Sequence, residues 1–158
     1  MSSHAPPRPP IAADTRSFAI VASKFNASYV QGLVDHATEE LRVLAPGAVV
    51  TLHRVPGAFE IPIVARELAR QRSAEAIIAM GIILQGRTAH ADHLARSVTD
   101  ALQHIALEHG IPVINAVLSL ENEQQALERC LEEELNRGTE AARAAVEIAD
   151  VLSTLRAR

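Results

Sequence analysis

Four continuous apolar runs are spaced along the chain, with helix-like segments between them. The runs cover residues 18–22, 49–52, 76–83 and 113–118. Short apolar runs of this kind are typical of strands covered on both faces, as in a parallel sheet. The segments between them repeat apolar residues at helical spacing, over residues 30–41, 61–68 and 94–105. Since every connection is then a helical crossover, the pattern predicts a three-layer αβα sandwich around a four-stranded parallel sheet.

Both ends of the chain add to this plan. After the fourth run, one helix is expected from about Asn122, where Gln125 can complete a capping box, and another after Gly138. The first ten residues include four prolines, which suit neither a helix interior nor a central strand. We therefore expect a flexible arm over residues 1–16 and a single domain over residues 17–158.

Composition narrows the class of protein. A formal net charge of −4 with 3% aromatic residues argues against binding nucleic acid, which favours a basic surface and stacking rings. The apolar runs are too short to span a bilayer, so no membrane partner is expected. With Cys130 as its one cysteine and no arginine-then-apolar leader, the chain is expected to be cytoplasmic.

Polar turns follow each predicted strand, where ligands of open parallel sheets bind. They occupy residues 24–26, 56–60, 85–90 and 119–122. Taken singly, such turns can be punctuation: Gly57 and Gly86 would supply permissive dihedrals, and Asn26 would cap a helix. Helix N-termini at these turns also present unsatisfied N–H groups to anions. Because all four turns meet at one sheet edge, we expect a binding site there.

The turns carry motifs of a known family. They are Phe25-Asn26, the Val-Pro-Gly-Ala-Phe-Glu run at 55–60, Gly86-x-Thr88-x-His90, the Glu-Gln-Gln-Ala-Leu-Glu-Arg run at 123–129 and Asn136-Arg137-Gly138. In this order, over about residues 17–152, the chain resembles the lumazine synthases of riboflavin biosynthesis. The resemblance implies a flavodoxin-like sheet and a transferase that condenses 5-amino-6-ribitylaminouracil with 3,4-dihydroxy-2-butanone 4-phosphate. Phosphate and water leave, 6,7-dimethyl-8-ribityllumazine forms, and no cofactor or metal is implied.

Such a condensation needs mainly two substrates held in reacting geometry and modest proton transfer. The resemblance assigns the proton shuttle to His90, whose ordinary pKa lies near neutral pH. It assigns the phosphate to Arg129, whose guanidinium can bind it in a fork. Gly86, Arg87 and Thr88, expected to begin the third crossover helix, would hold the same phosphate.

The ribitylaminouracil would occupy the rest of the site. By family analogy, Phe25 stacks on the pyrimidine ring, although a core phenylalanine is the simpler alternative. Asn26, the backbone near Ala58, and Glu60 suit a polyol chain. The remaining residues that the resemblance places against this substrate are Phe59, Ile82, Ile83, Leu84, Asn115 and Arg137.

Some positions depart from the commoner family pattern, and two other readings follow. Gln85 stands where arginine is frequent, Asn115 where phenylalanine is frequent, and Ala91-Asp92-His93 replaces an aromatic-acid-tyrosine run. A shell-forming or low-activity paralogue would bind the pyrimidine or flavin-like ligands without efficient turnover. Alternatively, His90 to His93 could contribute to a metal site, because residues three apart share a helix face.

The resemblance also implies assembly. It predicts a cyclic homopentamer with shared sites: Phe25, Glu60 and His90 from one chain, and Asn115, Arg129 and Arg137 from the next. Some family members stack pentamers into a sixty-subunit icosahedral shell. The prolines of the N-terminal arm could hinder such a shell by blocking strand addition to a neighbour.

Overall fold

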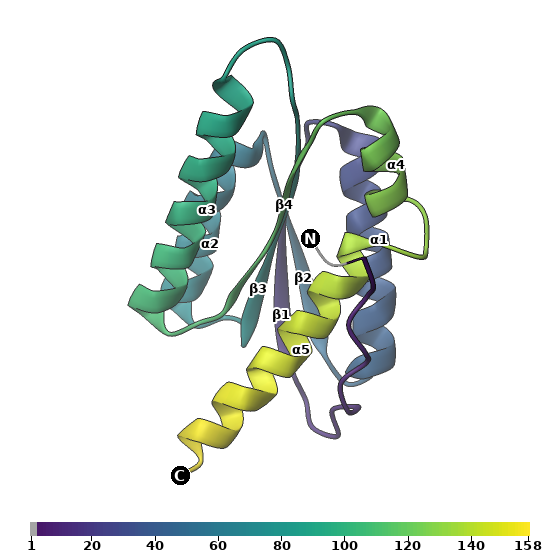
Figure 1. Ribbon diagram of the computed structural model, residues 1–158. Helices are drawn as coiled ribbons and strands as arrows, with labels where there is room; N and C mark the ends of the chain where they lie inside the picture. Colours follow the sequence, from purple (N-terminus) through teal and green to yellow (C-terminus); the bar gives the residue numbers. More distant parts are fainter. Residues whose placement is uncertain (1–2) are drawn as a thin grey trace.

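The computed structural model describes residues 3–158 and contains the predicted parallel sheet (Figure 1). The strands lie in the order β2-β1-β3-β4, and all three neighbouring pairs are parallel. The elements are β1 (Ser17–Ser23), α1 (Ala27–Leu44), β2 (Val49–Val55), the short 3-10 helix η1 (Ala58–Glu60), α2 (Ile61–Gln71), β3 (Ala76–Leu84), α3 (His90–His109), β4 (Val113–Leu120), α4 (Glu123–Cys130) and α5 (Arg137–Arg156).

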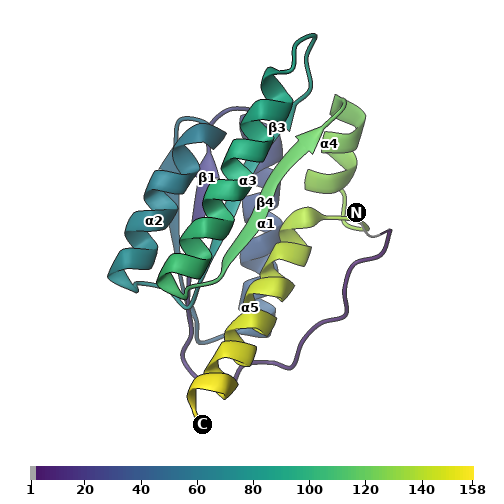
Figure 2. The same cartoon turned by 60° about the vertical axis from the view of Figure 1, so that its left-hand side comes forward.

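Helices cover both faces of the sheet, which confirms the three-layer αβα sandwich. Figures 1 and 2 show α2 and α3 on one face and α1, α4 and α5 on the other. One buried cluster joins α1 and α5 to the sheet, with Phe18, Ile20 and Leu33 among its fully buried members. The second cluster joins α2 and α3 to the opposite face through residues such as Ile61 and Ile77.

Strand β2 differs from the prediction that every strand is covered on both faces. Val49 is 58% exposed and Leu52 is 46% exposed. The physical reason is strand order: β2 is an edge strand, whereas the side chains of the inner strands β1 and β3 are almost all buried. An apolar run alone does not distinguish an edge strand from a central one.

Helix α3 also begins later than predicted, at His90 rather than at Gly86. Strand β3 runs through Leu84, and the Gln85 amide continues its ladder by donating to the Leu120 carbonyl (2.8 Å). Gly86 and Thr88 have low helix propensity, which favours the irregular connection seen over residues 85–89.

The two C-terminal helices are present, with refined starts. Asn122 Oδ1 accepts from the Gln125 amide (2.9 Å), but the reciprocal Gln125 side-chain bond goes to the Glu121 amide instead of closing a capping box on Asn122. Helix α4 ends at Cys130. Helix α5 begins at Arg137, because Asn136 caps it by accepting from the Gly138 and Thr139 amides.

The described part of the N-terminal arm lies against α1 and α5. The Ala12 amide donates to the Leu44 carbonyl, and the Arg8 guanidinium pairs with the buried Glu40 carboxylate (2.8 Å). Arg143 of α5 pairs with the same carboxylate (2.8 Å). Residues 1–2 of the predicted arm lie outside the described residues, and the flexibility of the arm stays a prediction.

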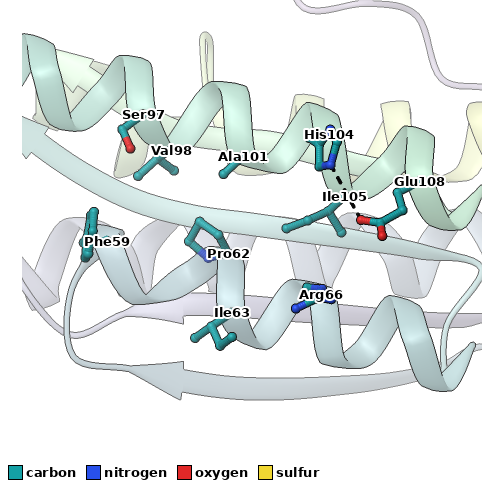
Figure 3. Close-up of a pocket in the computed structure, with 10 residues that line it drawn as sticks. All are labelled: Phe59, Pro62, Ile63, Arg66, Ser97, Val98, Ala101, His104, Ile105 and Glu108. Atoms are coloured by element: carbon teal, nitrogen blue, oxygen red, sulfur yellow. Dashed lines mark ion pairs between the residues drawn. The ribbon is translucent and has the colours of Figure 1, made fainter.

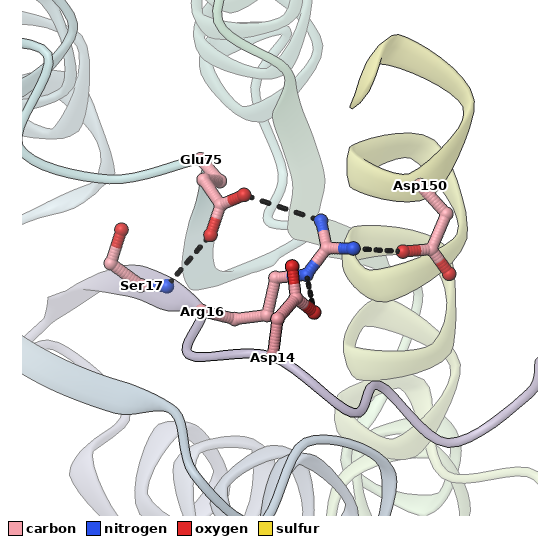
Figure 4. A network of polar contacts seen from close by, with 5 residues as sticks. All are labelled: Asp14, Arg16, Ser17, Glu75 and Asp150. Carbon is pink, nitrogen blue, oxygen red and sulfur yellow. Dashed lines mark hydrogen bonds and ion pairs between the residues drawn. The ribbon is translucent and has the colours of Figure 1, made fainter. Parts of the chain in front are cut away.

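Arg16 anchors the end of the arm at the start of β1. Its buried guanidinium pairs with Asp14, Glu75 and Asp150, at 3.0, 3.2 and 2.7 Å (Figure 4). The Glu75 carboxylate also accepts from the Ser17 amide. This network ties the arm, the start of β3 and the C-terminal half of α5 together at the amino ends of the strands. Within residues 3–158, no helix combines the length and apolarity needed to cross a bilayer.

Candidate functional site

A cavity of about 340 Å³ lies at the carboxyl ends of β1 and β3, where the polar turns were predicted to meet. Nine of the expected site residues line it: Phe25, Asn26, Ala58, Ile82, Ile83, Leu84, Gly86, Thr88 and His90. Ala91 and Leu94 complete the lining. They had not been predicted as site residues, although Leu94 lies four residues after His90 and three after Ala91, spacings that share a face of α3.

The turn after β1 is built around Asn26. This residue adopts the left-handed conformation (φ 56°, ψ 48°), which asparagine tolerates better than most residues. Asn26 occupies the N-cap position of α1, but its side chain makes no capping bond. The simpler alternative, in which Asn26 only caps the helix, therefore does not hold. Instead, Asn26 Nδ2 donates to the Ile82 carbonyl (3.0 Å) and ties the turn to β3.

The Phe25 side chain lies at the cavity rim. It is 70% exposed, so the alternative of a core phenylalanine does not hold in this chain. Gly57, in the turn that follows β2, lies against the Phe25 ring: a β-carbon added at Gly57 would stand 3.0 Å from Phe25 Cδ2. Gly57 has an extended φ of −142°, and Gly110 is the glycine with positive φ among the described residues. Gly57 thus provides close approach and not a special dihedral, and Gly86 also lacks the positive φ that the simpler alternative would give it.

The turn from β2 into α2 places its residues in different directions. Ala58 is buried and lines the cavity. Glu60 does not line it; one of its carboxylate oxygens accepts from the Gly57 amide (2.9 Å), which holds η1 in place. Phe59 lines a separate groove of about 590 Å³ between α2 and α3, together with Ile63 (Figure 3). Their exposed fractions are 66% and 64%.

Strand β3 offers unpaired backbone groups to the cavity. Its register with β1 ends at Ala22 and Met80, whereas its register with β4 continues to Leu84. Beyond Met80, the edge of β3 that faces β1 therefore has no strand partner. Backbone groups of successive strand residues point to opposite edges, and the Asn26 bond to the Ile82 carbonyl shows that those of Ile82 face the Phe25–Asn26 turn. Those of Ile83 face β4, as the Gln85 amide two residues later does when it donates to the Leu120 carbonyl.

The connection between β3 and α3 closes the cavity. Gln85 Nε2 donates to Asp92 Oδ1 (3.3 Å), a bond that spans the loop at its base. The Thr88 hydroxyl oxygen lies 3.4 Å from the His90 amide nitrogen at the start of α3. Arg87 belongs to the same loop but does not line the cavity.

Three predicted residues lie away from this cavity. Asn115 is exposed on the edge strand β4, where its Nδ2 donates to the Thr99 hydroxyl (3.2 Å). Arg129 is in the last turn of α4, on the other face of the sheet from α3. Arg137 is 7% exposed and forms an ion pair with Glu140, so its charge is balanced within its own helix. Within one chain the structure does not bring these three residues to the cavity.

The His90 to His93 segment is exposed apart from Ala91. Across residues 3–158, no group of three or more histidine, cysteine, aspartate or glutamate side chains is placed to hold a metal ion.

Comparison with known proteins adds independent information. A family model described as 6,7-dimethyl-8-ribityllumazine synthase matches residues 15–153. The chain is also similar to the 6,7-dimethyl-8-ribityllumazine synthase of Aquifex aeolicus (strain VF5). The two are 38% identical over 147 residues, which cover 92% of this chain and 96% of the relative.

Proposed function

This chain belongs to the 6,7-dimethyl-8-ribityllumazine synthase family, and we propose that it is an active synthase of riboflavin biosynthesis. It condenses 5-amino-6-ribitylaminouracil with 3,4-dihydroxy-2-butanone 4-phosphate, and releases phosphate and water with the lumazine product. The observation that carries this proposal is the cavity at the carboxyl ends of β1 and β3, which gathers six residues from the turns that carry the family motifs and three from the end of β3.

The pyrimidine binds against the Phe25 ring in this proposal. The exposed ring at the rim supplies a flat apolar face, and the open edge of β3 supplies backbone hydrogen-bonding groups at Ile82 and Leu84. Asn26 and Glu60 already hold the turns on either side of the ring. A ribityl chain running over these turns meets hydrogen-bonding groups on both side chains.

The butanone phosphate binds beside the loop over residues 85–89. Its phosphate meets the amides of Gly86 and Thr88 and the positive end of α3, and Arg87 and Arg129 provide the charge. His90 lies at the first turn of α3, next to this position, and transfers protons during imine formation and ring closure. Most of the rate enhancement comes from holding the two substrates together.

We further propose that the complete site forms between two chains of a homopentamer. Asn115, Arg129 and Arg137 lie away from the cavity of their own chain, so a second copy is the source of these groups for each cavity. The groove between α2 and α3 supports contact with a neighbour, since Phe59 and Ile63 leave apolar surface exposed there (Figure 3). To bind a substrate in the cavity of a neighbouring chain, Arg137 must either break its ion pair with Glu140 or bind the substrate while keeping that ion pair.

Turnover tests the activity directly. Purified protein is mixed with both substrates, and the absorbance of the lumazine product is followed together with released phosphate. We expect product and phosphate in equal amounts, with neither formed when one substrate is omitted. Uptake of the pyrimidine without product would instead favour the low-activity alternative, to which the departures at Gln85 and Asn115 point.

Light scattering tests the assembly. We expect the mass of five chains, or of sixty chains if pentamers stack into a shell. A stable monomer that turns over at the full rate would exclude shared sites. Mixing His90→Ala chains with Arg129→Ala chains gives a sharper test, because activity above that of either impaired variant alone requires groups from two chains in one site.

A further inference from the structure

Helix α1 touches the segment that carries Arg129 and Arg137 at two points where there is no room for a side chain. A β-carbon added at Gly32 would overlap the Cys130 carbonyl oxygen and stand 2.5 Å from Leu131 Cδ2. A β-carbon added at Gly138 would overlap the carbonyl oxygen of Leu33. Both overlaps involve backbone atoms, which cannot swing aside as a flexible side chain can. Neighbouring residues of α1 therefore hold both ends of the segment in backbone contact.

His36 extends the first contact by one helical turn. It lies four residues after Gly32, on the same face of α1. Its Nε2 lies 3.3 Å from the Leu131 carbonyl oxygen and can donate a hydrogen bond to it. Leu131 follows the last residue of α4, where helix carbonyls lack partners within the helix. Gly32 thus allows the end of α4 to approach α1, and His36 provides a donor for it there.

The rest of the segment is closed internally by Asn136, whose side chain is almost fully buried. Its Nδ2 donates to the Glu132 carbonyl (3.0 Å), while its Oδ1 accepts from the Gly138 amide (2.9 Å). Cys130, with no exposed surface, fills the space beside α1. The connection from α4 to α5 is therefore held at both ends and across its middle.

Arg129 lies one residue before the first point of contact. We propose that Gly32 and His36 are positioning residues, which fix the last turn of α4 and so set where the Arg129 guanidinium points. This inference rests on the proposed function, in which Arg129 binds the phosphate of the butanone substrate. Neither α1 residue lines the cavity, and neither touches a substrate in this proposal.

Kinetics of Gly32→Ala test the proposal. The added methyl group forces the end of α4 away from α1, and a displacement of about 1 Å can weaken a reaction about 100-fold. We expect the KM for the butanone phosphate to rise at least tenfold and the KM for the pyrimidine to stay within about twofold. Gly47→Ala is the matched control, because the nearest atom to its added β-carbon would be 4.0 Å away; it should change neither value.

His36 provides a second, milder test in case Gly32→Ala fails to fold. His36→Ala removes the donor and should raise the same KM. His36→Gln keeps an N–H donor and should restore most of the loss. A loss in His36→Ala that glutamine does not restore, or equal changes in both KM values in these variants, would overturn the positioning role.

Hydrogen exchange separates failure of this inference from failure of the proposed function. A wild-type protein without turnover would refute the function alone. Exchange of residues 126–139 would still be measured, and we expect it to be faster in His36→Ala than in wild type while α3 is unchanged. Unchanged exchange over residues 126–139 would refute the positioning role whatever the activity.

Discussion

The ring of Phe25 and the α-carbon of Gly57 are in close contact, so that a β-carbon at Gly57 would stand 3.0 Å from Phe25 Cδ2 and 3.1 Å from Glu60 Oε2. Gly57→Ala should therefore shift the ring and disturb the Glu60 bond to the Gly57 amide. The extended backbone of Gly57 accepts alanine, so the fold should persist. We expect the KM for the pyrimidine to rise about tenfold, equivalent to about 1.4 kcal/mol. An unchanged KM would show that the Phe25 ring does not contact this substrate.

Arg129→Ala should act mainly through the other substrate. It removes a charge-assisted bond to phosphate worth about 1.5–3 kcal/mol, so the KM for the butanone phosphate should rise about 10- to 100-fold. Arg42→Ala is the control, because Arg42 is an exposed arginine in the last turn of α1. Equal effects of Arg129→Ala on both substrates would indicate a structural role for this residue.

His90→Ala should slow turnover without abolishing it. General acid–base help contributes about 10²- to 10⁴-fold, whereas both substrates remain held together. We expect kcat to fall within that range with small changes in both KM values. His93→Ala is the comparison, because His93 does not line the cavity. If kcat fell in His93→Ala and not in His90→Ala, proton transfer would belong to His93.

Glu40 should stabilise the fold in a pH-dependent way. Its hydrogen bond from Arg8, together with Arg143, holds the pKa of the buried carboxyl below its ordinary value, against the effect of burial. This stabilisation is present above the pKa of the unfolded chain, about 4.3, and is lost as the pH falls through the lower folded pKa. Glu40→Gln should lower the free energy of unfolding by about 1–3 kcal/mol at pH 7.

Urea unfolding at fixed protein concentration measures this difference. The gap between Glu40→Gln and wild type should shrink as the pH is lowered below about 4. Glu39→Gln serves as the control, because Glu39 is the exposed neighbour on the same helix. A gap that stays constant at acidic pH would mean that the carboxylate charge is not what stabilises the arm.

Cys130 should be inert in the folded protein. Burial raises the pKa of its thiol to about 12, although nearby Arg129 favours the thiolate. Only a small fraction is then ionised at pH 8, and the thiolate is the reactive form. We expect a thiol-specific colour reagent to label Cys130 at the rate of unfolding in buffer and within minutes in urea. Fast labelling in buffer would contradict the tight contact between α1 and the end of α4.

Much of this fold could be predicted from hydrophobic periodicity. The four strands and the helices between them follow from it, and parallel connection brings their carboxyl ends to one edge. That is why residues as distant in sequence as Phe25 and His90 could be expected in one site. The site residues from the last two turns could not be placed on this basis, because their distance from the cavity depends on how α4 and α5 pack.

Other features depend on tertiary contacts that no local pattern carries. Asparagine is a residue type that often caps helices, yet the Asn26 side chain donates to the Ile82 carbonyl on β3. The apolar side chains of β2 resemble those of a buried strand, yet strand order leaves that strand at the edge. The Val-Pro-Gly-Ala-Phe-Glu motif likewise does not reveal that Phe59 turns toward α3 and away from the cavity.

A chain still on the ribosome can pair β1 with β2 well before β3 has been made. The other edge of β1, which later pairs with β3 from Phe18 to Ala22, then has no partner while residues 56–75 are added. At about 5–20 residues per second this takes on the order of 1–4 s. During that interval the apolar edge of β1 is available to other nascent chains as a strand partner. The central position of β1 in the sheet therefore leaves one of its two edges without a partner during early synthesis.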